Sequence, residues 1–99
     1  MATKVVQKEI LSAVKPNLFQ VLLLNDDYTT MEFVVVVLMK YFSKSQEAAK
    51  RLMLKIHIEG EAVCGVYSHD VAQTKVTQVI EFSRKNEQPL MCIIRELSD

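Results

Sequence analysis

LFQVLLLNDD (residues 18–27) is the stretch of sequence that decides the fold. Its first seven residues are almost wholly apolar, and Pro16 lies two positions before them. An apolar run of this length, bounded by a proline and by polar residues, predicts a β-strand that is covered on at least one face. Asn25, Asp26 and Asp27 are therefore expected where the chain leaves the sheet.

Two helices are predicted after this strand. Thr29 and Glu32 have the spacing of a capping box, and Ser43 and Gln46 repeat it. The first cap is followed by an apolar stripe at helical spacing, which comprises Met31, Val34, Val35, Leu38 and Phe42. The second is followed by a stripe of Ala48, Ala49, Leu52, Met53 and Ile56. Gly60 is predicted to end the second helix in a left-handed conformation.

The remaining pattern predicts a strand, a helix and a strand. Residues 62–67 form the second strand, in which Gly65 indicates the close approach of another backbone. Ser68 is a plausible cap for a third helix, and residues 90–97 form the last strand after Pro89. The order β-α-α-β-α-β predicts an α+β sandwich, with a three-stranded antiparallel sheet packed against three helices. We expect a core domain over residues 17–99 and a flexible N-terminal extension over residues 1–16.

Composition limits the possible functions. The chain has 99 residues, of which 49% are hydrophobic, and its twelve basic and twelve acidic side chains cancel. No overall charge favours nucleic acid or an anionic membrane surface, and the longest apolar run, 33–39, is far shorter than the roughly twenty residues of a membrane helix. Without a recognisable secretory signal, the chain is expected to be a cytoplasmic monomer with Cys64 and Cys92 as reduced core thiols.

A candidate binding site follows from the polar residues. Asn25, Asp26 and Asp27 precede the first helix, and His57 lies at the edge of the apolar stripe of the second. Such a cluster suits a cationic group with donors to satisfy, and the apolar side chains beside it suit a hydrophobic companion. The structural alternative is that the acidic residues only form a turn and that the histidine is a satisfied core residue.

Several separated motifs together resemble the ClpS adaptors. They are Asn25-Asp26-Asp27-Tyr28-Thr29, Met31-Glu32-Phe33-Val34, Leu52-Met53-Leu54 with His57, Cys64-Gly65-Val66-Tyr67, Thr74-Lys75-Val76 and Pro89-Leu90. The resemblance covers about residues 15–96. It implies a non-catalytic adaptor that binds N-degron proteins, whose free N-terminal residue is a large hydrophobic one (Leu, Phe, Tyr or Trp). The adaptor would deliver them to the N-terminal domain of a ClpA-type AAA+ unfoldase of the ClpAP protease.

The same resemblance implies residue roles, with no metal and no cofactor. Asn25, Asp27 and His57 would accept hydrogen bonds from the α-ammonium group, and Asp26 would add negative potential or hold the next backbone amide. The side-chain pocket would be lined by Leu23, Thr29, Met31, Val34, Met53, Ile56 and Leu90. Met31 would crowd its entrance and disfavour branching at the substrate β carbon. The unfoldase interface would comprise Tyr28, Asp70 and Lys75.

Some residues depart from the family pattern. Thr30 stands where proline is usual, which is expected to loosen the first helical turn. Ile56 adds a methylene where valine is common, which predicts a tighter pocket that favours Leu or Phe over Trp. Asp70 and Gln73 stand where glutamates are frequent.

Two other classes of protein fit parts of this pattern. A hydrolase could use Asp26, Asp27 and His57 as metal ligands or as a general base. However, His69 is remote from any acidic pair in the sequence, and there is no His-Glu-x-x-His spacing. A generic interaction domain like the ribosomal stalk module has a similar architecture, but it would need no acidic pocket.

Overall fold

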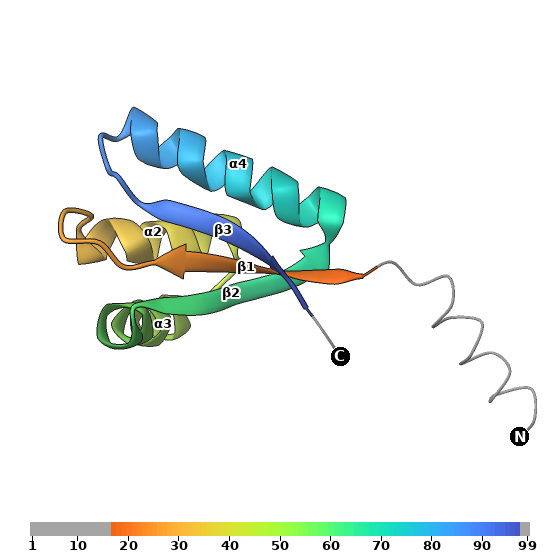
Figure 1. Cartoon of the computed structure of the whole chain (residues 1–99). Helices are drawn as coiled ribbons and strands as arrows, with labels where there is room; N and C mark the ends of the chain where they lie inside the picture. Colours follow the sequence, from red (N-terminus) through yellow and green to blue (C-terminus); the bar gives the residue numbers. More distant parts are fainter. Residues whose placement is uncertain (1–16, 98–99) are drawn as a thin grey trace, which may run out of the picture.

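The computed structural model describes residues 17–97, which form one α+β domain (Figure 1). Its elements in chain order are β1 (Leu18–Leu24), α2 (Met31–Tyr41), α3 (Gln46–Glu59), β2 (Glu61–Ser68), α4 (His69–Lys85) and β3 (Met91–Glu96). The predicted order and fold class are confirmed. The predicted extension at residues 1–16 lies outside the described residues.

The apolar strand β1 is the centre of the sheet, whose order is β2-β1-β3 with both pairings antiparallel. Leu24 at the end of β1 lies opposite Glu61 and Met91, which are the first residues of β2 and β3. At the other end of β1, Leu18 lies opposite Ser68. The loop that carries Asn25 to Asp27 therefore leaves the sheet where α3 passes into β2 and where the α4–β3 loop arrives.

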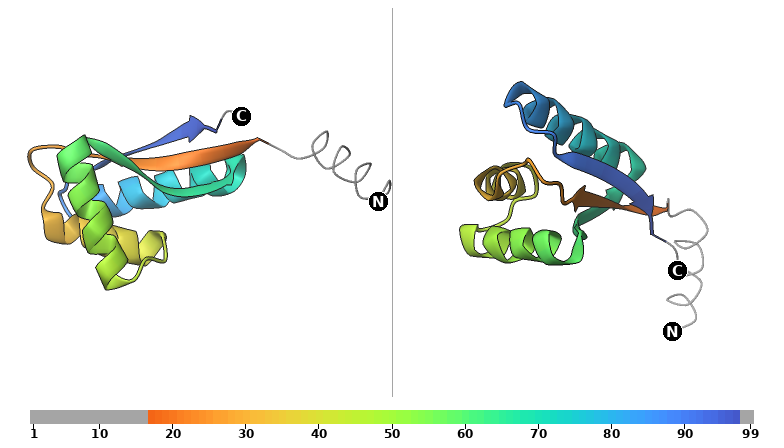
Figure 2. Two further views of the ribbon diagram at one scale, coloured as in Figure 1. Left: turned by 90° about the horizontal axis from the view of Figure 1, so that it is seen from below. Right: turned by 60° about the vertical axis from the view of Figure 1, so that its left-hand side comes forward.

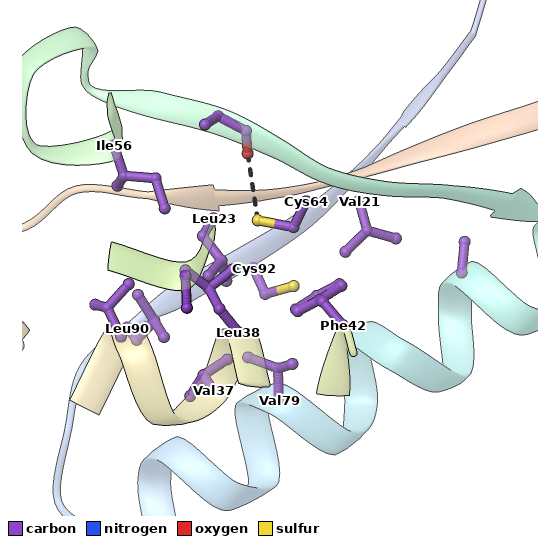
Figure 3. Packing of buried hydrophobic residues seen from close by; sticks show 14 residues of the cluster. Val21, Leu23, Val37, Leu38, Phe42, Ile56, Cys64, Val79, Leu90 and Cys92 are labelled. Atoms are coloured by element: carbon purple, nitrogen blue, oxygen red, sulfur yellow. Dashed lines mark hydrogen bonds between the residues drawn. The ribbon is translucent and has the colours of Figure 1, made fainter. Parts of the chain in front are cut away.

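All three helices cover the same face of the sheet (Figure 2). Burial on that face explains the apolar side chains of β1 that point toward the helices, since Val21 and Leu23 lie in the core and are fully buried. Figure 3 shows these side chains packed against Val37 and Leu38 of α2 and Val79 of α4. The valine run of α2 has strand propensity, so this tertiary packing holds it helical.

The caps of α2 and α3 differ from the prediction. The N-cap of α2 is Thr30, whose side chain accepts from the Phe33 amide at 3.1 Å, so Thr29 is not the cap. The N-cap of α3 is Ser45, which accepts from the Ala48 amide, and Ser43 lies before it with a positive φ of 54°. In each case the cap is a hydroxyl residue one or two positions later in the chain. Neither cap is followed by Glu or Gln at the third position, so the loop before the helix and not the capping-box spacing decides where the helix begins.

Three local predictions have clear outcomes. Gly60 ends α3 in the left-handed region with φ 93°, as predicted. Ser68 is the N-cap residue of α4, although its side chain makes no capping hydrogen bond. At Gly65 a Cβ atom would collide with the Tyr67 side chain, so the close neighbour is an aromatic ring and not a second backbone.

Cys64 and Cys92 lie in the core as free thiols (Figure 3). Burial raises the pKa of each thiol to about 12, so neither is a thiolate at neutral pH. In the described part of the chain, no helix combines the length and apolarity needed to cross a membrane.

Candidate functional site

The loop after β1 is organised by Asp26. One carboxylate oxygen, Oδ1, accepts from the backbone amides of Tyr28 at 2.8 Å and Thr29 at 2.7 Å. The other, Oδ2, accepts from the Thr29 hydroxyl at 2.6 Å. A carboxylate offers about four acceptor positions, so these bonds leave one for a ligand. Asp26 is thus a turn former, as the structural alternative expected, and its oxygens are mostly committed inside the loop.

These contacts keep Asp26 ionised. Burial on its own would raise the pKa of this carboxyl, but the hydrogen bonds from Thr29 and Tyr28 and the positive charge of Arg84 outweigh it and lower the pKa below its ordinary value of 3.8. The loop therefore carries a fixed negative charge at neutral pH.

The neighbouring Asn25 connects this loop to the end of α3. Its backbone amide donates to the carbonyl of Gly60 at 2.8 Å. Gly60 in turn donates its amide to Ile56 and closes α3 one turn after that residue. His57 lies in the same last turn, so this bond places the imidazole on the same side of the molecule as the polar loop.

A hollow of about 250 Å³ lies between the polar loop, α2 and α3. Asn25, Asp26, Asp27 and His57 supply its polar residues, so the structure brings all four predicted polar side chains together. Its other lining residues are Thr29, Met31, Val34, Met53 and Ile56. Val34 and Ile56 are buried, whereas Met31 is 44% exposed and lies at the mouth.

Leu23 and Leu90 are placed differently from the other predicted pocket residues. They do not line the hollow; both are fully buried, in the same core cluster as Val34 and Ile56, which do line it. A strand residue at the sheet centre and a residue leading into β3 support the pocket from behind. The sequence could not distinguish residues that line the pocket from residues that pack behind it, because both kinds of residue are apolar.

The polar side chains of the hollow differ in how they are used. In contrast to Asp26, the side chains of Asn25, Asp27 and His57 form no hydrogen bond or ion pair with other residues of the described range 17–97, and all three residues are exposed. Free acceptors beside an apolar hole can receive the donors of a cationic group. Within residues 17–97, no group of three or more His, Cys, Asp or Glu side chains is arranged to hold a metal ion.

The three residues predicted to contact an unfoldase do not lie together. Tyr28 is 82% exposed in the loop that follows β1. Asp70 lies in the first turn of α4, next to the opposite end of β1. Lys75 lies five residues further along the helix, with its ammonium 5.8 Å from the centre of the Tyr67 ring. The seven residues of β1 separate the two places by about 20 Å.

The fold and the site together define a small α+β domain with a hollow of about 250 Å³ at one end of its sheet. Residues 14–93 match the family model described as ATP-dependent Clp protease adaptor protein ClpS. The chain belongs to the ClpS family.

Similar proteins include two bacterial relatives named ATP-dependent Clp protease adapter proteins. ClpS 2 of Bradyrhizobium diazoefficiens is 50% identical over 95% of this chain and 86% of its own length. ClpS of Rhodospirillum centenum is 50% identical over 96% of this chain and 88% of its own length. A solved structure, Agrobacterium tumefaciens ClpS2 bound to L-phenylalaninamide, is 38% identical, with a TM-score of 0.81 over 84% of this chain and all of that one. Both relatives are named as adaptors of an ATP-dependent Clp protease.

Proposed function

We propose that this chain is an N-recognin: it binds proteins whose free N-terminal residue is Leu, Phe, Tyr or Trp and delivers them to a ClpA-type unfoldase. The observation that carries the proposal is the hollow of about 250 Å³, lined by apolar side chains and by polar acceptors that no other residue of the range 17–97 occupies. This volume lies below the range of about 300–1,000 Å³ that is typical of drug-sized ligands, so it suits one side chain and its amino group.

The ligand of the solved relative supports this choice. L-Phenylalaninamide has a free α-amino group, a benzyl side chain and a neutral amide where a peptide bond would continue, so it resembles the first residue of a peptide. The relative that binds it shares the fold of this chain at a TM-score of 0.81.

In the proposed complex, the α-ammonium group of the substrate donates to Asn25, Asp27 and His57. An ammonium has three donors, and charge-assisted hydrogen bonds contribute about 1.5–3 kcal/mol each. The first side chain enters between Met31 and Val34 of α2 and Met53 and Ile56 of α3, where its burial contributes about 1.5–3 kcal/mol. The ammonium hydrogen bonds and the burial of the first side chain are both needed to offset the entropy lost on association. We expect a Kd on the order of micromolar.

Charge and shape set the specificity in this proposal. Acetylation removes the positive charge and two of the three donors, which leaves acceptors at the rim without partners and should weaken binding by at least about a hundredfold. Met31 at the mouth crowds the β carbon of the first residue, so Ile and Val should bind poorly.

Delivery requires a second surface. We assign docking of the unfoldase N-terminal domain to the start of α4, with Asp70 exposed in its first turn and Lys75 five residues later. This surface lies at the opposite end of β1 from the hollow, so a bound substrate would not obstruct it. Tyr28 belongs to the end that holds the hollow, and a docking role for Tyr28 would need a partner that reaches both ends.

The test is a fluorescence anisotropy titration with peptides that differ only in their first residue. Phe- and Leu-first peptides should bind, whereas their acetylated forms and Ile-first peptides should bind much more weakly. Asp27→Ala should weaken the binding of the free peptides by about tenfold or more with an unchanged melting temperature. Equal affinity for free and acetylated peptides would refute the proposed pocket.

Delivery is tested separately, by degradation of a Phe-first reporter with a ClpA-type unfoldase and its protease. Combined Asp70→Ala and Lys75→Ala changes should reduce delivered degradation and leave peptide affinity unchanged. Glu81→Ala, at an exposed position further along α4, is the matched control. Unchanged degradation by the double variant would show that the docking surface lies elsewhere.

A further inference from the structure

The first turn of α2 is held by a residue that does not line the hollow. The backbone amide of the N-cap residue Thr30 donates to the side-chain oxygen Oε1 of Gln88 at 3.1 Å, across 58 positions of sequence. In a capping box this amide is satisfied by Glu or Gln at the third helical position, but here that position is Phe33. Gln88, in the loop between α4 and β3, therefore accepts the hydrogen bond from the Thr30 amide that a Glu or Gln at the third helical position would accept in a capping box.

Gln88 is itself fixed by its surroundings. Its amide donates to the carbonyl of Ser83 at 2.8 Å, and its own carbonyl accepts from Nη1 of Arg84 at 2.9 Å. The same nitrogen donates to the carbonyl of Leu90 at 2.9 Å, and Nη2 contacts the sulfur of Met91 at 3.4 Å. Ser83 is fully buried and bonded to the helix backbone, so the network is anchored in the core.

This network reaches the hollow from two sides. Thr30 lies between Thr29 and Met31, which both line the hollow, and Met31 is 44% exposed. Arg84 also contributes the positive charge that favours ionised Asp26, the residue that shapes the polar loop. The first turn of α2 is therefore bonded directly to the α4–β3 connection, and Arg84 of the same network favours the negative charge of the polar loop.

We propose that Gln88 and Arg84 are positioning residues that set the width of the hollow between α2 and α3, and thereby the discrimination against β-branched first residues. This inference rests on the proposed function, because it concerns the same pocket. A narrow pocket entrance can exclude a β-branched side chain only if the residues that form the entrance do not move aside when the ligand binds. The wall that carries Met31 is held at its N-terminus by the Thr30–Gln88 hydrogen bond.

The experiment compares the affinities of Leu-first and Ile-first peptides in the unaltered full chain and in four variants of it. Gln88→Ala removes the acceptor for the Thr30 amide and should lower the Leu-to-Ile affinity ratio by about threefold or more, while Leu affinity falls about two- to tenfold. Gln88→Glu keeps an acceptor oxygen at the same reach and should restore the ratio. Arg84→Lys keeps the charge but cannot serve three acceptors from one planar group, so it should lower the ratio partly. Gln78→Ala, an exposed glutamine on α4, is the matched control.

Hydrogen exchange of the Thr30 amide gives a readout that does not depend on the ligand. This amide should be protected in the unaltered chain and in Gln88→Glu, and exchange faster in Gln88→Ala. The inference is overturned if Gln88→Ala leaves the Leu-to-Ile ratio unchanged, or lowers both affinities by one common factor together with the melting temperature. If the unaltered chain binds neither peptide, the proposed function fails first, and the exchange result alone then shows whether the hydrogen bond exists.

Discussion

The backbone amide of Asn25 donates to the carbonyl of Gly60 at 2.8 Å and thereby joins the two halves of the polar rim. Asn25 is the first residue after β1, and Gly60 is the residue that ends α3. The carbonyl can point toward Asn25 because Gly60 adopts φ 93°, which an L-residue with a side chain rarely does. The loop with the acidic residues and the helix end with His57 are thus positioned by one glycine conformation.

Substitution of Gly60 should therefore affect stability and binding together. A Cβ atom at Gly60 would meet nothing within 4 Å, so the cost of Gly60→Ala is backbone strain, about 1–2 kcal/mol in the free energy of unfolding. Peptide affinity should fall as well, because the Asn25 hydrogen bond shifts. Urea denaturation and anisotropy titration measure the two effects. Gly60→Asn, which tolerates the left-handed region better, should lose less of both, and an equal loss in both variants would contradict the explanation by strain.

Asp26 should stabilise the fold in a pH-dependent way. A carboxyl with a lowered pKa in the folded chain binds fewer protons there than when unfolded, so its stabilisation is fully present above its ordinary value of 3.8 and is lost as the pH falls through the folded-state pKa. Asp26→Ala removes three loop hydrogen bonds and should cost about 1–2 kcal/mol at neutral pH.

The matched variant Asp26→Asn separates charge from hydrogen bonding. Asn can still accept from the amides of Tyr28 and Thr29, so it should lose less stability than Ala at neutral pH. It has no carboxyl to protonate, and its unfolding free energy should change less with pH below about pH 5 than that of the unaltered chain. If the unfolding free energies of Asp26→Asn and of the unaltered chain fall in parallel at low pH, carboxyl groups other than that of Asp26 dominate the acid dependence.

Local patterns were enough to predict the elements that depend on neighbouring residues. The bounds of β1 follow from an apolar run between a proline and a polar loop, and the end of α3 follows from Gly60. The polar residues of the hollow were also predictable, because Asn25 to Asp27 end a buried strand and His57 lies near the end of the helix that passes back beside it.

What the sequence did not reveal depends on contacts between distant residues. Thr30 was expected to loosen the first turn of α2, yet its hydroxyl caps the helix and its amide is bonded by Gln88. Thr29 has the capping spacing, but both its amide and its hydroxyl are bonded to Asp26. The competition between Thr29 and Thr30 for the cap is decided by residues 26 and 88, and no local pattern includes the second of these.

His57 is expected to supply one acceptor to the ammonium group, because an unprotonated ring nitrogen of imidazole offers a lone pair. His57→Ala removes this acceptor and should lower the affinity for a Phe-first peptide by about tenfold or more, with an unchanged melting temperature. His57→Gln keeps a polar acceptor and should lose less affinity. Anisotropy titration of both variants measures these effects. An affinity of His57→Ala equal to that of the unaltered chain would exclude the imidazole as an acceptor.

Ile56 should limit the size of the first residue that the hollow accepts. Its side chain is 2% exposed, and it belongs both to the lining of the hollow and to the core cluster that holds Leu23 and Leu90 (Figure 3). Ile56→Val removes one methylene from this shared wall, which should cost about 0.5–1.5 kcal/mol in unfolding free energy and enlarge the hollow from inside. Anisotropy titration should then show a higher affinity for Trp-first relative to Leu-first peptides. Ile80→Val, at a half-buried position of α4 that does not line the hollow, should lower stability without changing this ratio. If both variants leave the ratio unchanged, the size of the pocket is set by the exposed mouth at Met31 and not by the depth that Ile56 defines.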